Sequence, residues 1–177
     1  MDFTEKTIST EEIFKGRIIN VNVDTVELPN GHSATRELVK HPGGVGVIGV
    51  DSNRRVVTVK QYRKPFDKVI EEIPAGKLEY GEDPMKAAKR EFEEETGLFA
   101  KEITPIGTFY SSPGFCDEKI HLYLATDFEN VGQHPDEDEF LEIYYRNLDD
   151  LVKEVLNGEI SDGKTAIAVL AAKQILG

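Results

Sequence analysis

An uninterrupted apolar segment, VGVIGV at 45–50, most restricts how this chain can fold. Its side chains do not alternate between apolar and polar, which is typical of a strand that is covered on both faces. The pattern therefore favours a sandwich, with packing layers on each side of a central sheet. We expect further strands at 55–62, 104–110, 119–126 and 140–145, and helices at 84–96, 148–156 and 164–176.

The segment that precedes this apolar run has a different pattern. Residues 16–28 alternate apolar and polar side chains, as a half-buried strand does, and Pro29-Asn30-Gly31 is a strong turn signal. Residues 33–40 can return as a second strand, after which His41-Pro42-Gly43-Gly44 interrupts the pattern. The fold class is therefore predicted as an α/β or α+β sandwich with a small antiparallel sheet before it. The expected domains are an N-terminal β subdomain at 1–44 and a main domain at 45–177.

The chain has 177 residues, one cysteine and a formal net charge of −12. No apolar run approaches the ~20 residues that a membrane-spanning helix needs, and the first residues lack the pattern of a signal peptide. Because Cys116 is alone, no intramolecular disulfide can form, and a reducing cytoplasm is the expected compartment. The negative charge opposes binding to nucleic acid through a general basic surface. We therefore expect neither a membrane nor a nucleic-acid partner.

The acidic excess is confined to two segments. Residues 71–95 carry nine acidic and four basic side chains, and residues 127–150 carry nine acidic and one basic side chain. The rest of the chain carries 15 acidic and 16 basic side chains and is nearly neutral. Two solvated faces would explain such runs, and the alternative is that the acids form an arranged site.

The first predicted helix has an unfavourable distribution of charge. Glu91, Glu94 and Glu95 share one face because they are three and four residues apart, and they crowd the C-terminal end, where the helix dipole favours cations. Such a departure from local consistency is expected at functional sites. Three carboxylates on one face suit a hard ion such as Mg²⁺ or Mn²⁺ better than zinc. The alternative is an exposed helix end whose charge is partly offset by Lys89 and Arg90.

The residues around this helix follow a nine-position pattern from Gly76 to Leu98. Gly76 is followed after five residues by Glu82, and after seven more by REFEEETGL at 90–98. This series resembles the Nudix box, G-x5-E-x7-R-E-U-x-E-E-x-G-U with U apolar, at every specified position. The resemblance implies an α/β/α sandwich with a mixed sheet, in which a loop–helix–loop holds divalent metal against a substrate diphosphate. It also implies an enzyme that hydrolyses nucleoside diphosphates linked to another group.

Residue roles are implied by the same resemblance. Glu91 and Glu95 would bind the metal together with the backbone carbonyl of Ala75, and Glu95 counts among the catalytic residues. Gly76 is expected to allow the tight turn that exposes the Ala75 carbonyl. The residues that would orient these ligands from behind are Glu82, Arg90 and Glu94.

Residues outside the box resemble the ADP-ribose pyrophosphatase subfamily, in particular members from Gram-positive bacteria. Pro113 lies 16 positions after Gly97, and the segments EIPAGK at 72–77 and KQYR at 60–63 are similar as well. The N-terminal sheet also matches, since those enzymes exchange it between the subunits of a homodimer. Without the resemblance, SSPG at 111–114 would be a turn and each arginine a surface charge. The implied substrate contacts are Arg36, Arg63, Lys77, Ser112, Pro113, Gly114 and Glu118, of which Arg36 and Glu118 would reach across the dimer.

The second acidic segment contains Asp136-Glu137-Asp138-Glu139. In the subfamily a loop at this place carries the carboxylate that completes the site. Glu139 would bind metal, and Glu139 and Glu137 compete for the role of general base. Two or three Mg²⁺ ions, for which Mn²⁺ can substitute, would neutralise the diphosphate and lower the pKa of a bound water. The implied products are AMP and ribose 5-phosphate.

Three functions are open at this point. The first is a Mg²⁺-dependent ADP-ribose pyrophosphatase. The second is a Nudix hydrolase that cleaves a nucleotide sugar, NADH or a flavin dinucleotide. The third is a non-catalytic module that binds ADP-ribose, which the complete set of box carboxylates disfavours because such a module has no need to keep a costly acidic cluster.

Overall fold

A computed structural model of the protein describes residues 2–132 and 140–177. The chain divides into two compact units. The first contains residues 1–43 and 110–119, and the second contains residues 44–109 and 120–177.

The first unit is built on a three-stranded antiparallel sheet in the order β1-β2-β3, with bounds β1 (Lys6–Lys15), β2 (Asn20–Glu27) and β3 (Ser33–Lys40). The predicted return strand at 33–40 is confirmed, but the first predicted strand begins at Asn20 instead of residue 16. A tight turn, in which the Gly16 N–H donates to the Ile19 carbonyl at 2.9 Å, takes up the residues in between. The strand β1 was not predicted from the sequence, and its ten residues are all exposed.

The segment 110–119 is attached to the C-terminal end of β3. The Val39 N–H donates to the Phe115 carbonyl at 2.7 Å, and the Asp117 N–H donates to the Val39 carbonyl at 3.1 Å. The Asp117 carboxylate accepts the His41 N–H at 2.9 Å and pairs with Lys40. These bonds explain why residues 110–119 belong to the first unit, although they connect two strands, 98–110 and 119–130, that lie mostly in the second unit.

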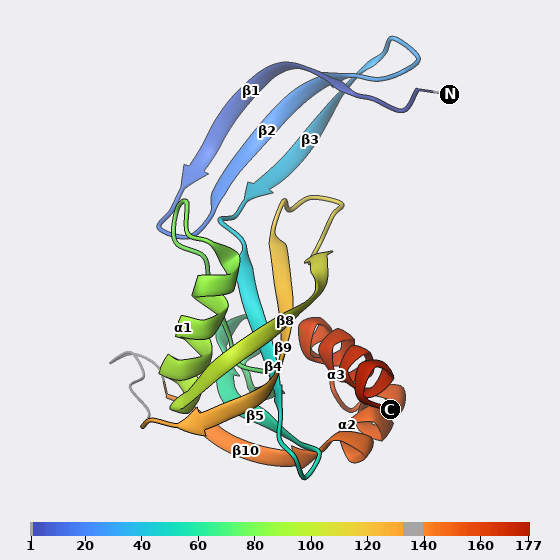
Figure 1. The fold of residues 1–177 in the computed structure, drawn as a ribbon. Coiled ribbons are helices and arrows are strands. Elements are labelled where there is room, and N and C mark those ends of the chain that lie inside the picture. The colour runs from blue at the N-terminus through green and yellow to red at the C-terminus, as the bar shows by residue number, and fades with distance from the viewer. Residues whose placement is uncertain (1, 133–139) are drawn as a thin grey trace. The chain divides into compact units, whose positions relative to one another are not determined.

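The second unit contains a mixed sheet in the order β10-β5-β4-β9-β8, with β6 paired to β5 and β7 to β4 (Figure 1). Its strands are β4 (Gly44–Val50), β5 (Arg55–Arg63), β6 (Lys68–Glu72), β7 (Ala75–Lys77), β8 (Leu98–Tyr110), β9 (Lys119–Asn130) and β10 (Glu142–Asn147). A short 3-10 helix, η1 (Lys64–Phe66), joins β5 to β6. The central β4 runs antiparallel to β5 and parallel to β9, and all of its residues are buried, as its apolar run predicts.

Helices cover both faces of this sheet (Figure 1). On one face, Ala87, Ala88 and Phe92 of α1 (Pro84–Thr96) join the core that includes Val45 and Val47. On the other, α2 (Leu148–Leu156) and α3 (Gly163–Leu176) pack against Ile48 and Val50, through Leu148, Leu151, Ala168 and Val169. The predicted α/β/α sandwich is therefore confirmed. Within the described ranges, no helix is long and apolar enough to cross a lipid bilayer.

Candidate active site

Local sequence signals set the length and the orientation of α1. The Asp83 carboxylate accepts the N–H groups of Met85 and Lys86 at 3.1 and 3.0 Å, and Pro84 occupies the first helical position. Gly97 ends the helix in the left-handed conformation at φ 68°. Phe92 is fully buried and packs edge-to-face on Phe128, with ring centroids 5.7 Å apart. With Phe92 fixed in the core, the C-terminal glutamates are fixed in direction as well.

Arg90 neutralises much of the acidic end of α1. Its Nε and Nη2 bind the two carboxylate oxygens of Glu82 at 3.2 and 3.1 Å, and its Nη1 lies 2.9 Å from Glu91 and 2.8 Å from Glu94. The hydrogen bond to Glu82, reinforced by the charge of Glu91, raises the pKa of Arg90 above its ordinary value. The same bond lowers the pKa of Glu82. The structure thus brings together the three residues predicted to orient the ligands, since the Arg90 guanidinium binds both Glu82 and Glu94.

Two of the predicted metal ligands, Glu91 and Glu95, lie against the backbone of β7. The Glu95 side chain is almost fully buried, and its Oε2 accepts the N–H of Ala75 at 2.9 Å. A Cβ built on Gly76 would lie 1.9 Å from Cδ and 2.0 Å from Oε2 of Glu91. The backbone of residues 75 and 76 therefore lies directly against two carboxylates of the helix.

This close approach gives Gly76 a steric role beside the expected one. Gly76 lies within β7 and is not among the glycines with positive φ in the described chain, so its backbone does not need the left-handed conformation. Instead, the absence of a side chain leaves the space that the Glu91 carboxylate fills.

The chemistry of the predicted ligands fits a hard divalent cation. The Glu91 and Glu95 carboxylates and the carbonyl of Ala75, the predicted third ligand, are all oxygen donors, which Mg²⁺ and Mn²⁺ prefer. No group of three or more His, Cys, Asp or Glu residues within the described part of the chain is arranged as a metal site. Only two carboxylates of the predicted ligand set belong to that part, because Glu139 and the competing base Glu137 lie outside the described residues.

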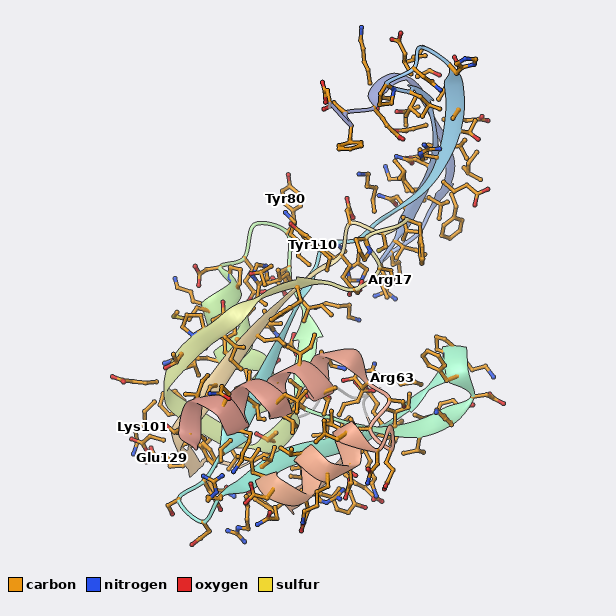
Figure 2. All side chains as sticks on the ribbon, turned by 90° about the vertical axis from the view of Figure 1, so that its right-hand side faces the viewer. Arg17, Arg63, Tyr80, Lys101, Tyr110 and Glu129 are labelled. Carbon is orange, nitrogen blue, oxygen red and sulfur yellow. The ribbon has the colours of Figure 1, made fainter. Side chains whose placement is uncertain are left out.

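No sequence motif predicts the buried ion cluster that lies around Glu72, a few residues before β7. Glu72, at the end of β6, is 2% exposed, and both of its carboxylate oxygens bind Arg63, through Nε and Nη2 at 2.7 Å each. Lys164, near the start of α3, also binds the Glu72 carboxylate. Burial would raise the pKa of Glu72, but the hydrogen bond from Arg63 and the charge of Lys164 outweigh burial and lower it. Figure 2 labels Arg63 at the end of β5.

The substitution Glu72→Gln is expected to destabilise the protein by about 2 kcal/mol at neutral pH, because Arg63 and Lys164 would lose their shared counter-charge. The loss is smaller than for a fully buried ion pair because Arg63 is still partly solvated. The pKa of Glu72 is lower in the folded protein, so this stabilisation is present above its unfolded pKa of about 4.3 and is lost as the pH falls through the folded value. Urea unfolding of both proteins between about pH 3 and 7 measures the difference.

The exposed Glu102 provides the control for this pH series, because Glu102→Gln removes the same charge from the same unit. We expect that variant to unfold like the unaltered protein at every pH. A Glu72→Gln penalty that is constant down to the lowest pH would contradict the assignment of the stabilisation to the ionised carboxylate.

The remaining predicted substrate residues lie in the first unit, except for Lys77, which is exposed on β7 of the second. Arg36 binds Glu5 through its Nε at 2.8 Å. Oε1 of Glu118 lies 3.4 Å from Nδ1 of His41. The Ser112 carbonyl accepts the N–H groups of Phe115 and Cys116, which closes the expected turn, and Pro113 and Gly114 line a cavity of about 280 Å³.

Comparison with known proteins gives the family. Residues 40–166 match the NUDIX domain model, and residues 5–39 match the nucleoside diphosphate sugar hydrolase N-terminal domain. The chain is 50% identical to an ADP-ribose pyrophosphatase of Bacillus subtilis, over 93% of this chain and 90% of that protein. It is also 50% identical to a methanol dehydrogenase activator of Bacillus methanolicus, over 94% and 91% of the two chains.

A solved structure shows the same fold at low sequence identity. The crystal structure of an ADP compounds hydrolase superposes with a TM-score of 0.85, over 99% of this chain and 96% of that one, at 19% identity. The nine box positions, the Arg90 cluster on α1 and the match over residues 40–166 agree with one another. From them we conclude that this chain belongs to the Nudix family of hydrolases.

Proposed function

We propose that this protein hydrolyses the diphosphate of ADP-ribose to AMP and ribose 5-phosphate. The observation that carries the proposal is the contact of the Ala75–Gly76 backbone with Glu91 and Glu95, because it joins the oxygen donors that a divalent ion needs. The choice of ADP-ribose rests on the 50% identity to the Bacillus subtilis ADP-ribose pyrophosphatase, which extends over nearly the whole of both chains.

Hydrolases of this family generally use divalent metal ions. In this proposal Ala75, Glu91, Glu95 and Glu139 hold two or three Mg²⁺ ions, for which Mn²⁺ can substitute. When bound, the metal supplies positive charge to the diphosphate and lowers the pKa of a coordinated water.

The chain's own side chains complete the reaction. Glu139, or Glu137 in competition with it, accepts the proton of the attacking water. Arg63 stabilises the charge of the departing phosphate, since its planar guanidinium matches phosphate oxygens. Glu72 orients this side chain, which is still 38% exposed and can therefore reach a substrate. Arg36 and Lys77 add positive charge, while Ser112, Pro113, Gly114 and Glu118 bind the rest of the substrate.

We also propose a homodimer that exchanges the N-terminal sheet. Among the described strands, β1 lies at one edge of its sheet and carries Ile8, Ile13 and Phe14, each more than half exposed. Exposed apolar side chains on an edge strand favour a second copy as their cover. The single cysteine supports the reducing cytoplasm as the compartment.

Two alternatives have support. The first is a Nudix hydrolase of another diphosphate, namely a nucleotide sugar, NADH or a flavin dinucleotide, and the N-terminal match to a nucleoside diphosphate sugar hydrolase domain supports the nucleotide sugar among them. The 50% identity to the methanol dehydrogenase activator favours activation of a methanol dehydrogenase as a second candidate function. A non-catalytic module that binds ADP-ribose is the least supported, because Glu91 and Glu95, the glutamates proposed to bind metal, both lie against the backbone of residues 75 and 76.

A substrate panel tests the proposal. ADP-ribose, ADP-glucose, NADH and a dinucleoside polyphosphate are each incubated with the protein and Mg²⁺, and the phosphate-containing products are identified by chromatography and mass spectrometry. We expect ADP-ribose to be cleaved at least about 10-fold faster than the others, a preference worth about 1.4 kcal/mol. Similar rates across the panel would refute ADP-ribose specificity, and the absence of cleavage would favour the binding module. Addition of the protein to a methanol dehydrogenase tests the second candidate.

A further inference from the structure

The first turn of α3 is tied to the loop that carries the predicted metal ligands. Thr165, the third residue of the helix, is fully buried, and its Oγ1 accepts the N–H of Ile73 at 2.9 Å. The same hydroxyl donates its proton to Oδ2 of Asp162, the residue that caps α3, at 2.5 Å. The hydroxyl therefore acts as both donor and acceptor inside the protein, where water does not compete.

The link between β6 and β7 consists of Ile73 and Pro74, and each side of it is held by a different element. Thr165 of α3 holds the Ile73 N–H at one end. In the middle, the Pro74 carbonyl accepts the N–H of Val47 in β4 at 2.9 Å, and Pro74 has no N–H of its own. At the other end, Glu95 of α1 holds the Ala75 N–H. The position of the Ala75 carbonyl thus depends on three anchors.

We propose that Thr165 is a positioning residue for the metal site, which it influences from the sheet face opposite α1. Because it fixes Ile73, it fixes the direction in which the chain enters Ala75 and Gly76, and hence how these residues meet Glu91 and Glu95. Groups behind the ligands of a metal site orient the ligands, and their loss weakens metal binding. The inference rests on the proposed function, since it assumes that Ala75, Glu91 and Glu95 bind a divalent ion.

A purely structural role for Thr165 would predict a different result. A buried hydroxyl at the start of a helix contributes to folding wherever it lies, and its removal would then lower stability without a selective effect on metal binding. Thr58 is the matched control, because it is also fully buried and donates its hydroxyl proton to Glu71, at 2.8 Å, but bonds to no backbone group of the link. Thr58→Val removes the same group as Thr165→Val.

The experiment measures Mn²⁺ binding to the full chain without substrate, by the loss of the free Mn²⁺ signal in electron paramagnetic resonance. We expect Thr165→Val to bind Mn²⁺ about 10-fold more weakly than the unaltered protein. Thr165→Ser keeps the hydroxyl and is expected to restore binding, and Thr58→Val is expected to bind Mn²⁺ normally although it loses stability. If Thr165→Val does not fold, Thr165→Ala replaces it in the experiment, because alanine also lacks the hydroxyl and is smaller than valine.

The outcomes separate this inference from the proposed function. Normal Mn²⁺ binding by Thr165→Val, or equal weakening by Thr165→Val and Thr58→Val, would overturn the positioning role while the metal site stands. Weakening in Thr165→Ser equal to that in Thr165→Val would also overturn it, since the hydroxyl would not be responsible. Failure of the unaltered protein to bind Mn²⁺ would instead overturn the metal site and with it the proposed function.

Discussion

Loss of at least about 100-fold in kcat is the expected result of Glu95→Gln, with the fold retained. The substitution removes one negative charge from the predicted metal ligands, and a metal ion contributes several kcal/mol to stabilising the charge of such a transition state. At 25 °C each 1.4 kcal/mol corresponds to a factor of ten in rate, so a loss of about 3 kcal/mol produces this change.

The structure explains why Glu95→Gln removes the negative charge of the side chain without removing its hydrogen bond. Glu95 is almost fully buried and accepts the Ala75 N–H through Oε2, and the amide oxygen of a glutamine can accept the same hydrogen bond. The link to the β7 backbone is therefore kept. Because a neutral amide costs less to bury than a carboxylate, unfolding should require at least as much urea as in the unaltered protein.

Glu93→Gln is the matched control, since Glu93 lies on the same helix and occupies an unspecified position of the box. Both variants have the same net charge and side-chain chemistry. Hydrolysis of ADP-ribose is measured at saturating Mg²⁺, with urea unfolding in parallel. Turnover by Glu95→Gln close to that of Glu93→Gln would contradict the assignment of Glu95 to the metal.

The sequence predicts the elements whose signals are local. The bounds of α1 follow from Asp83, Pro84 and Gly97, and all three act as expected in the structure. The strand β1 gives no such signal, because its ten residues are all exposed and its pairing with β2 shifts register between Thr7 and Ser9 and between Glu12 and Phe14. Without a buried face and with bulges, a strand has no regular alternation to recognise.

The sequence predicts the part of the site that lies within the Nudix box. It does not predict the contacts between segments that are far apart in the chain. The resemblance to the box implies that Glu82, Arg90 and Glu94 act together, and the structure forms this cluster. The contacts of Lys164 with Glu72 and of Thr165 with Ile73 join residues 92 positions apart, which no local pattern reveals. The sequence signal is limited to a charged residue, Glu72, directly before the apolar Ile73-Pro74 pair.

Gly76→Ala is expected to reduce activity about as severely as Glu95→Gln. The new methyl group would overlap the carboxylate of Glu91, with 1.9 Å to Cδ. The overlapping atoms are the end of a flexible side chain, so rotation of Glu91 relieves the clash at little cost to folding. That rotation removes the carboxylate from the Gly76 backbone, and a displacement of about 1 Å at a reacting centre can reduce the rate about 100-fold.

The Gly163→Ala variant controls for loss of a glycine, since a Cβ at that position meets nothing within 4 Å. We expect it to keep full activity and a similar urea midpoint, whereas Gly76→Ala keeps the midpoint but loses both hydrolysis and Mn²⁺ binding. A shorter acid should relieve the overlap, so Gly76→Ala combined with Glu91→Asp is expected to be more active than the product of the two single losses predicts. If the losses simply multiply, or if Gly76→Ala stays active, the contact between Gly76 and Glu91 does not control the site.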